Sequence, residues 1–236
     1  MVNRQIARIG NTRKLSLKGA VVTVKNRSVV ILGGGGHASV VADCLRLLHY
    51  NIEGYVSCES QSLVENLRWL GNDDVFCQTY KPDEVRLVNG LGMTRSDRRR
   101  SSLFQNYRDL GYRFINLIHP SAIIAGNVRI SPDSGVQIMA GSIIQTGASI
   151  GPNVLINTGA IIEHHAEIAG GAHIAPGAVI CGGARIGKNA FIGARSTVIQ
   201  GVNIGEDVTV GAGAVVISDV MDRMTVVGVP AKGGQS

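Results

Sequence analysis

The chain has 236 residues, of which only 4% are aromatic and 31 are glycine. This length can hold one large or two modest domains, and so few rings argue against a globule packed around aromatic side chains. The formal net charge is +6, but residues 1–27 carry seven basic residues and no acid, so the rest of the chain sums to +6 − 7 = −1. We therefore expect a flexible basic extension over 1–27 and no nucleic-acid partner.

The four cysteines are scattered through the chain and form no C-x-x-C pair. This arrangement favours reduced thiols and a cytoplasmic location over a disulfide framework. No segment approaches the length and apolarity of a membrane span, and residues 1–27 lack the apolar core of a signal peptide. We expect no membrane partner.

The first expected elements are a strand over 28–32, a glycine-rich turn and a helix that begins near Val40. This order places backbone N–H groups at a helix N-terminus, where phosphate binds readily. We predict that the turn holds a phosphate of a nucleotide-bearing ligand, through Gly34, Gly35, Gly36, His37 and Ala38. A purely structural turn is the alternative. A nicotinamide site is disfavoured, because no acid is clearly placed about 20 residues further on.

The next segments alternate between strand-like and helix-like patterns. We expect a strand near Tyr55, a helix over 62–69, a strand over 85–89 and a helix over 96–110. Such alternation predicts a small Rossmann-like α/β domain with a parallel sheet, over residues 28–115. Within it, the run Arg98-Arg99-Arg100 is typical of a solvated helix face.

A repeat of six residues dominates the rest of the chain. Every sixth residue from Ile138 to Val216 is Ile or Val, and a small or β-branched residue stands four positions after each. This period fits neither a helix nor a long strand. It fits short parallel strands joined by corners, three faces and 18 residues to a coil. We predict an all-β parallel β-helix over 116–236, in which a run from Val226 to Lys232 covers the last coil.

One corner of this β-helix departs from the others, which are rich in Gly, Pro and Asn. It holds His164 and His165, and the 18-residue register places Gly182 beside His164. A histidine next to a free backbone N–H suits a general base beside an oxyanion donor. Asn157 is near enough to orient His164, and His173 should point outward. The alternative for each histidine is an ordinary solvated side chain.

Two further chemistries are disfavoured. The chain has no H-x-x-x-x-H pair of the kind found in zinc-binding β-helix proteins, so we expect no metal site. Cys181 has no histidine at a suitable neighbouring position. It is therefore interpreted as a small buried residue and not as an acyl-carrying nucleophile.

Together these motifs resemble the hexapeptide-repeat acyltransferases. Within them, the chain is similar to sugar acetyltransferases of the sialic acid O-acetyltransferase type and to bacterial UDP-amino-sugar or GDP-perosamine N-acetyltransferases. The resemblance covers about residues 28–232. It is carried by G-G-G-G-H-A at 33–38, I-H-P-S-A at 118–122, N-x-x-A-x-x-E-H at 157–164, H-I-A-P-G at 173–177 and G-V-P-A-K at 228–232.

The resemblance implies a left-handed β-helix, a homotrimer with active sites between adjacent helices, and acetyl-CoA as cosubstrate without a metal. It assigns His164 as general base, Asn157 as its support and the Gly182 N–H as oxyanion donor. The N-terminal turn would hold a nucleotide-linked sugar. The implied acetyl-CoA residues are His173, Gly182, Ala194, Gly211, Ala212 and Lys232.

Two departures from the family stand out. The residue after the base is His165 where the family usually has Asp or Glu, and Ser57, Cys58 and Glu59 replace a pair of Asp that often helps bind the nucleotide. The leading hypothesis is acetyl transfer to the amino group of a nucleotide-linked deoxy amino sugar, for surface polysaccharide or glycan synthesis. The alternatives are O-acetylation of a free sugar such as sialic acid and a non-catalytic β-helix assembly module.

Overall fold

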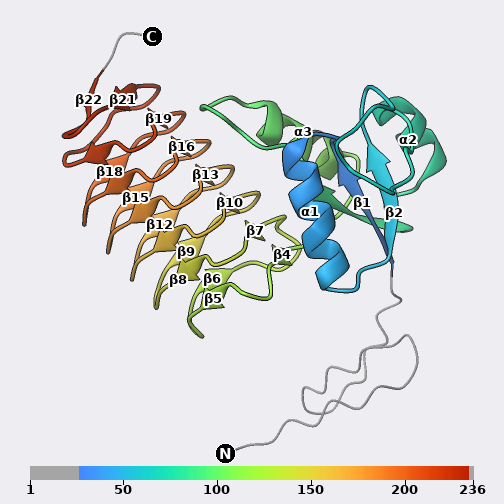
Figure 1. The fold of residues 1–236 in the computed structure, drawn as a ribbon, viewed down its shortest axis with the longest axis horizontal. Coiled ribbons are helices and arrows are strands. Elements are labelled where there is room, and N and C mark those ends of the chain that lie inside the picture. Colours follow the sequence, from blue (N-terminus) through green and yellow to red (C-terminus); the bar gives the residue numbers. More distant parts are fainter. Residues whose placement is uncertain (1–26, 234–236) are drawn as a thin grey trace, which may run out of the picture.

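The computed structural model describes residues 27–233, so the extension expected over 1–27 lies almost wholly outside the described residues. An α/β part comes first and sits beside the N-terminal coils of a long β-helix (Figure 1). The elements of the α/β part are β1 (Ser28–Leu32), α1 (Gly36–Leu47), β2 (Ile52–Val56), α2 (Asp73–Thr79), β3 (Val85–Asn89) and α3 (Arg99–Asp109).

The α/β part has a three-stranded parallel sheet in the order β2-β1-β3. The central strand β1 is buried over four of its five residues, because helices cover it on both sides. One core, around α1, also takes in Leu117, Met139 and Leu155 from the β-helix. The Rossmann-like topology is confirmed, and the α/β part shares a core with the β-helix.

The helix expected over 62–69 is wrong. The backbone of this segment bonds to neighbouring elements instead. Leu63 N–H donates to Gly34 O, while Tyr55 N–H donates to Arg68 O and Tyr55 O accepts from Leu70 N–H, which pairs the segment with the edge of β2. Pairing with a sheet edge has overridden a helical pattern. The helix lies further on as α2, where Asn72 caps Val75 N–H ahead of two acidic residues.

The β-helix follows, with strands of two residues in most cases. Its strands are β4 (Leu117–Ile118), β5 (Ile123–Ile124), β6 (Arg129–Ile130), β7 (Gln137–Ile138), β8 (Ile143–Ile144), β9 (Ser149–Ile150), β10 (Leu155–Ile156), β11 (Ile161–Ile162), β12 (Glu167–Ile168), β13 (His173–Ile174), β14 (Val179–Ile180), β15 (Arg185–Ile186), β16 (Phe191–Ile192), β17 (Thr197–Val198), β18 (Asn203–Ile204), β19 (Thr209–Val210), β20 (Val215–Val216), β21 (Thr225–Val227) and β22 (Lys232–Gly233).

The predicted register of 18 residues is confirmed. Ile156 pairs with Ile174, and Ile162 with Ile180, so equivalent residues stack in three parallel sheets. Both apolar positions of the hexad are buried from Ile138 to Val220 without exception. Burying one such aliphatic side chain contributes about 1.5–3 kcal/mol, so the two stacked columns hold neighbouring coils together.

The corners follow an equally strict rule. From Gly135 to Gly213, every sixth residue has a positive φ, the conformation of the third residue of a type II turn. These residues are Gly, Asn or Asp except at His165 (φ 57°) and Arg195 (φ 54°). For an ordinary L-residue this conformation costs about 1–2 kcal/mol.

The three faces of the β-helix differ in what they present outward. The covered face is the sheet β4-β7-β10-β13-β16-β19-β21-β22, which the α/β part covers except at its C-terminal strands. The polar face is the sheet β6-β9-β12-β15-β18, whose outward residues are mostly polar or charged. The aliphatic face is the sheet β5-β8-β11-β14-β17-β20, whose outward residues are mostly apolar. The outward column of the aliphatic face is Ile123, Ile143, Ile161, Val179, Thr197 and Val215, and Ile123 is 64% exposed.

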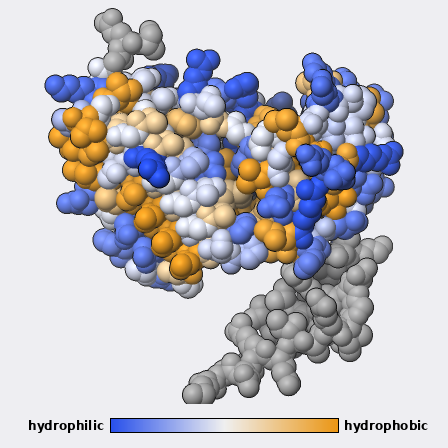
Figure 2. Space-filling model, viewed as in Figure 1, coloured by the Kyte–Doolittle hydropathy of each residue, from blue (hydrophilic) through white to orange (hydrophobic). Residues whose placement is uncertain are grey.

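The two ends of the β-helix depart from its regular coils. The step from Ile130 to Ile138 is eight residues instead of six, and in this longer corner Asn116 Oδ1 accepts from Ser134 N–H and Val136 N–H. At the other end, β21 adds to β19 and β22 turns back along it, which covers the last coil. Apolar side chains gather on the surface over these C-terminal coils (Figure 2). In the sequence of this region, Met221 and Val229 are exposed. No helix within residues 27–233 is long and apolar enough to cross a membrane.

Candidate active site

The His164-His165 corner lies between the aliphatic and polar faces, and both imidazoles are exposed. His164 leans on the coil after it: a Cβ placed on Gly182 would lie 2.5 Å from its Cε1 and its Nε2. His165 leans on the coil before it, where a Cβ on Gly147 would lie 2.9 Å from its Nε2. Only glycine at both stacked positions leaves room for the two rings.

The backbone around this corner fits the predicted oxyanion site. Gly183 N–H donates to His164 O at 2.9 Å, which aligns the two coils. The Gly182 N–H has no hydrogen-bond partner within residues 27–233, and the same residue contacts the His164 ring on its Cβ side. Burial, followed by the charge of Glu163, raises the pKa of the neighbouring Cys181 thiol, which leaves it a poor nucleophile.

A cavity of about 340 Å³ opens at a different corner, between the covered and aliphatic faces. It holds four of the predicted acetyl-CoA residues, His173, Ala194, Gly211 and Ala212, together with Asn157. Its other lining residues are Met93, Thr94, Ala175, Pro176, Phe191, Gly193, Thr209 and Val210. One wall therefore comes from the α/β part, through Met93 and Thr94, a contribution that no local pattern in the sequence indicated.

The structure separates the remaining predicted residues from this cavity. His164 and Gly182 stand at the next corner, across β11, from the corner that begins at Asn157. Lys232 is exposed on β22, in the same sheet as the cavity but beyond β19 and β21. Within one chain, the candidate base and the cavity do not meet.

His173 points out of the coil, as predicted, yet it is buried, because the α/β part covers it and Phe191 packs edge-on against its ring. Asn157 Oδ1 accepts from Thr158 N–H, so its Nδ2 donates to His173 Nε2 at 3.2 Å. His173 is thereby held as a neutral ring protonated on Nδ1. Burial, and next the charge of Arg100, lower the pKa of His173 to about 3. Within the chain, Asn157 bonds to His173 and not to His164.

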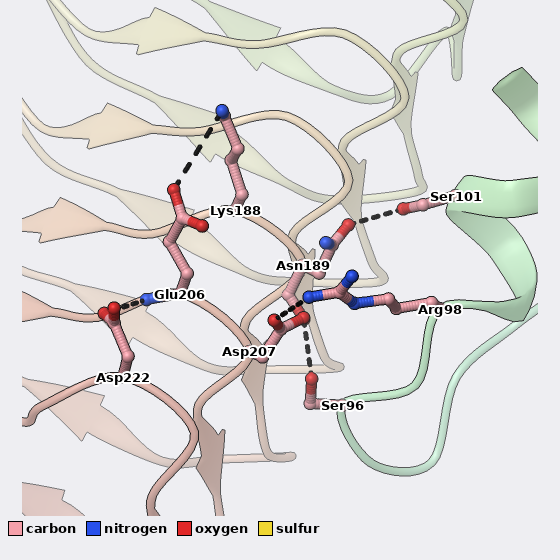
Figure 3. Close-up of polar contacts among 8 residues, drawn as sticks. All are labelled: Ser96, Arg98, Ser101, Lys188, Asn189, Glu206, Asp207 and Asp222. Carbon is pink, nitrogen blue, oxygen red and sulfur yellow. Dashed lines mark hydrogen bonds and ion pairs between the residues drawn. The ribbon is translucent and has the colours of Figure 1, made fainter.

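The loop between β3 and α3, residues 90–98, forms a strap over the covered face. Ser96 N–H donates to Thr209 Oγ1 at 3.0 Å, and Ser96 Oγ donates to Asn189 O at 3.0 Å. Figure 3 shows the strap and α3 reaching the β-helix corner at Asn189, with Arg98 paired to Asp207 at 2.7 Å and Ser101 bonded to Asn189. These bonds hold one wall of the cavity in place.

The prediction of a solvated face for Arg98-Arg99-Arg100 is wrong for the last residue. Arg100 is fully buried, and its Nη1 donates to Leu91 O at 2.6 Å and to Asn89 O at 3.2 Å. Burial lowers the pKa of its guanidinium to about 9. The signal was present in the sequence, because Arg100 shares one helix face with Phe104 and Tyr107, and all three are buried.

The glycine-rich turn leads into α1, whose N-cap Gly35 has no side-chain capping bond. The first N–H groups of the helix are therefore open to an anion. The His37 side chain faces the β-helix instead: Gln137 donates to Asn89 O, so its Oε1 accepts from His37 Nε2 at 2.7 Å. Burial, and next the charge of Arg100, lower the pKa of His37 to about 4, so the ring is neutral.

No group of three or more His, Cys, Asp or Glu side chains in the described part of the chain could hold a metal ion. The geometry offers an exposed histidine beside a free N–H, a mostly apolar cavity and an open helix N-terminus. Those features suit transfer of a group from a large cosubstrate to an acceptor that carries phosphate.

Comparisons with known families agree with this geometry. Residues 28–106 match the model of the PglD N-terminal domain, and residues 183–218 match the hexapeptide repeat of succinyl-transferase. No curated protein matches the sequence at a significant level.

Solved structures match nearly the whole chain. A His-to-Asn variant of perosamine N-acetyltransferase from Caulobacter crescentus, in complex with CoA and GDP-perosamine, is 36% identical over 89% of this chain and 97% of its own, with a TM-score of 0.80. The acetyltransferase domain of PglB from Neisseria gonorrhoeae is 32% identical over 88% of this chain and 100% of its own, with a TM-score of 0.82. That domain is also solved in complex with acetyl coenzyme A.

Proposed function

This chain belongs to the hexapeptide-repeat acetyltransferases that carry a PglD-type N-terminal domain, and from that premise we propose that it transfers an acetyl group from acetyl-CoA to the amino group of a nucleotide-linked amino sugar. Membership of this family makes the chain an acyltransferase, which removes the alternative of a non-catalytic β-helix module. The perosamine enzyme acts on the amino group of a GDP-linked sugar, which favours N-acetylation over O-acetylation of a free sugar.

The observation that carries the proposal is the position of His164 against Gly182. The Cε1–Nε2 edge of the ring lies on the side of Gly182 where a Cβ would stand, and the Gly182 N–H has no partner within residues 27–233. We therefore place the attacking amine at His164 Nε2 and the thioester carbonyl oxygen at the Gly182 N–H. His164 Nε2 takes a proton from the sugar amine as the nitrogen bonds to the thioester carbon. The Gly182 N–H stabilises the charge on the carbonyl oxygen. As the C–S bond breaks, the proton passes from His164 to the sulfur of CoA.

The cavity supports the acetyl-CoA assignment. Its lining is mostly small and apolar, through Ala175, Ala194, Gly211 and Ala212, and such small side chains leave room for the pantetheine arm of CoA. His173 and Asn157 supply polar groups in fixed orientations. Lys232 lies two strands beyond Thr209 in the same sheet, where its charge suits the phosphates of CoA.

The α/β part supports the nucleotide assignment. In α/β sheets, ligands bind at the carboxyl ends of the strands, which here are the glycine-rich turn after β1 and the residues after β2. Trp69 donates from Nε1 to Ser57 O, at the end of β2, and its side chain is partly exposed. We place the phosphates on the N–H groups of residues 34–38 and the base near Ser57.

A homotrimer would complete the active site. The aliphatic face is flanked by the His164 corner on one side and by the cavity corner on the other. Packing this face against a second copy would bury its outward Ile and Val column and bring the His164 of one subunit toward the cavity of the next. The proposed active site therefore lies between subunits.

The direct test is release of free CoA from acetyl-CoA in the presence of UDP-, GDP- and dTDP-linked amino sugars. We expect turnover with one nucleotide class and a fall in kcat of about a hundredfold or more in His164→Ala. The control is His49→Asn, an exposed histidine at the end of α1. If His164→Ala turns over acetyl-CoA at nearly the wild-type rate, His164 is not the base.

A binding test separates the two acceptor classes. Trp69 is the only tryptophan of the chain, so the indole emission comes from the end of β2 alone. Quenching by one nucleoside diphosphate, together with a higher melting temperature, would support the nucleotide-linked acceptor. Indifference to UDP, GDP and dTDP, with CoA release from a free sugar, would favour the O-acetyltransferase alternative.

A further inference from the structure

His165 occupies a turn position with a positive φ, where most corners of the β-helix have Gly, Asn or Asp. It is the third residue of the turn 163–166, closed by a bond from Ala166 N–H to Glu163 O at 3.3 Å, and its φ is 57°. Every equivalent corner from Gly135 to Gly213 has Gly, Asn or Asp, apart from Arg195. The imidazole thus has a conformation that costs an ordinary L-residue about 1–2 kcal/mol, and such strained positions cluster at functional sites.

The two imidazoles of this corner contact each other directly. His164 Nδ1 lies 3.2 Å from His165 Nδ1, with the ring planes at 75°. Two ring nitrogens at this distance can bond only if one carries a hydrogen and the other a lone pair. The stacked glycines Gly182 and Gly147 leave the rings this space and no more.

The direction of the hydrogen bond between His164 and His165 follows from the proposed role of His164 as the base. Its Nε2 edge faces Gly182, so a base that acts there needs its lone pair on Nε2 and its hydrogen on Nδ1. His165 Nδ1 must then be the acceptor. We infer that His165 is a positioning residue that accepts the Nδ1–H of His164, fixes the reactive tautomer and so replaces the carboxylate that the family usually has at this position. This inference rests on the proposed role of His164.

The charged groups around the pair are few. Glu163 belongs to the same turn, Cys181 lies in the next coil, and Glu167 and Arg185 pair at 3.7 Å on the adjoining polar face. The coil before contributes only Thr146 and Gly147. No carboxylate bonds to either imidazole within residues 27–233. The group that faces His164 Nδ1 is therefore another imidazole and not a carboxylate.

The first experiment compares His165→Gly, His165→Asn and His165→Glu with the wild type. Glycine suits the positive φ but removes the acceptor, so we expect an unchanged or higher melting temperature, unchanged KM for both substrates and a kcat lower by about tenfold. Asn and Glu each return an acceptor oxygen, and we expect them to recover most of kcat. Arg195→Gly makes the same backbone change at another corner and serves as the control for melting temperature.

The shape of the pH profile separates positioning from simple packing. A carboxylate supports a protonated His164 better than a neutral ring does, so the acid limb of kcat/KM should move to higher pH in His165→Glu. A folded His165→Gly with wild-type kcat and pH profile would overturn the inference. So would a folded His165→Glu that neither recovers kcat nor moves the acid limb.

A spectroscopic readout keeps this inference distinct from the proposed function. In protein with 15N-labelled histidine, nitrogen shifts at neutral pH should show His164 protonated on Nδ1 in the wild type, and a mixture of tautomers in His165→Gly. An Nε2-protonated His164 in the wild type would overturn the inference even if acetyl transfer is established. Wild-type activity in His164→Ala would instead overturn the proposed role of His164 as the base.

Discussion

At the scale of single residues, the histidines of the candidate site are of two kinds. His164 and His165 are exposed at a corner, where we propose that His164 acts as the base and His165 positions it. Burial, and next the charge of the nearby Arg100, lower the pKa of both His37 and His173, so these two rings are neutral. Their ring nitrogens serve as fixed hydrogen-bond partners, for Gln137 and Asn157 respectively.

This burial predicts a loss of stability on mild acidification. In the native state, the pKa is about 4 for His37 and about 3 for His173, whereas both rings titrate near 6.5 in an unfolded chain. Between about pH 6.5 and 5 the unfolded chain binds more protons, so the free energy of unfolding falls as pH falls, by on the order of 1 kcal/mol per unit for each ring. Thermal melts over this range should show a weaker slope in His37→Gln and in His173→Gln. An unchanged slope in both variants would contradict the burial argument.

At the scale of elements, the strap over 90–98 determines the cavity. Its Met93 packs with Ala175 and Phe191 of the β-helix, and its far end is bonded to the corner at Asn189. Asn189 has a positive φ, and its Oδ1 accepts from Ser101 Oγ at 2.6 Å. One side chain thus satisfies the turn and anchors the start of α3.

Asn189→Gly should loosen the strap without unfolding the corner. Glycine keeps the positive φ and the backbone carbonyl that accepts from Ser96, and it removes only the bond to Ser101. We expect KM for acetyl-CoA to rise about fivefold, the effect of one lost hydrogen bond, with little change in kcat. Arg98→Gln is the matched control, since the ion pair to Asp207 is exposed on the Arg98 side and should contribute little. Equal KM values in Asn189→Gly and the wild type would show that the strap does not shape the binding site.

At the scale of the whole molecule, the three faces of the β-helix have different tasks. The covered face carries the cavity and the α/β part, and the polar face is suited to water. The aliphatic face, with its column of Ile and Val, is the surface through which we propose that copies associate.

Ile161→Lys should therefore break the assembly and abolish transfer together. Lysine would stand in the middle of the aliphatic column, where burial of its charge is costly, whereas Ser149→Lys on the polar face should change nothing. Light scattering after size-exclusion chromatography measures the mass, and CoA release measures activity. A monomeric Ile161→Lys with full turnover would contradict an active site between subunits.

Complementation tests the same point without breaking the assembly. His164→Ala and Ala194→Trp each disable one part of the site, the base and the cavity. If the parts come from neighbouring subunits, co-expression in equal amounts should restore about a quarter of wild-type activity, because one neighbouring pair in four joins an intact base to an intact cavity. No recovery in mixed assemblies would place the whole site within one chain.

Much of the site could be predicted, because the contacts within the β-helix join residues that are close in the sequence. Each coil contacts only its neighbours, so the hexad alone places Gly182 beside His164 and stacks Ile156 on Ile174. The order of strand, turn and helix over 28–47 could likewise be predicted, because it depends on residues that are adjacent in the sequence. Motifs quoted from the family led to four residues of the cavity, His173, Ala194, Gly211 and Ala212.

By itself, then, the sequence determined the coils, their register and the residues at each corner. Only the tertiary structure decided which face the α/β part covers. That contact buries His173 and supplies the strap as a cavity wall. Tertiary packing within the α/β part also buries Arg100 and pairs 68–70 with the edge of β2 in place of the expected helix. The physical reason is distance along the chain. His37 bonds to Gln137, 100 residues away in the sequence. Such a contact depends on how the surfaces of the α/β part and the β-helix fit together, and a periodic sequence pattern does not specify that fit.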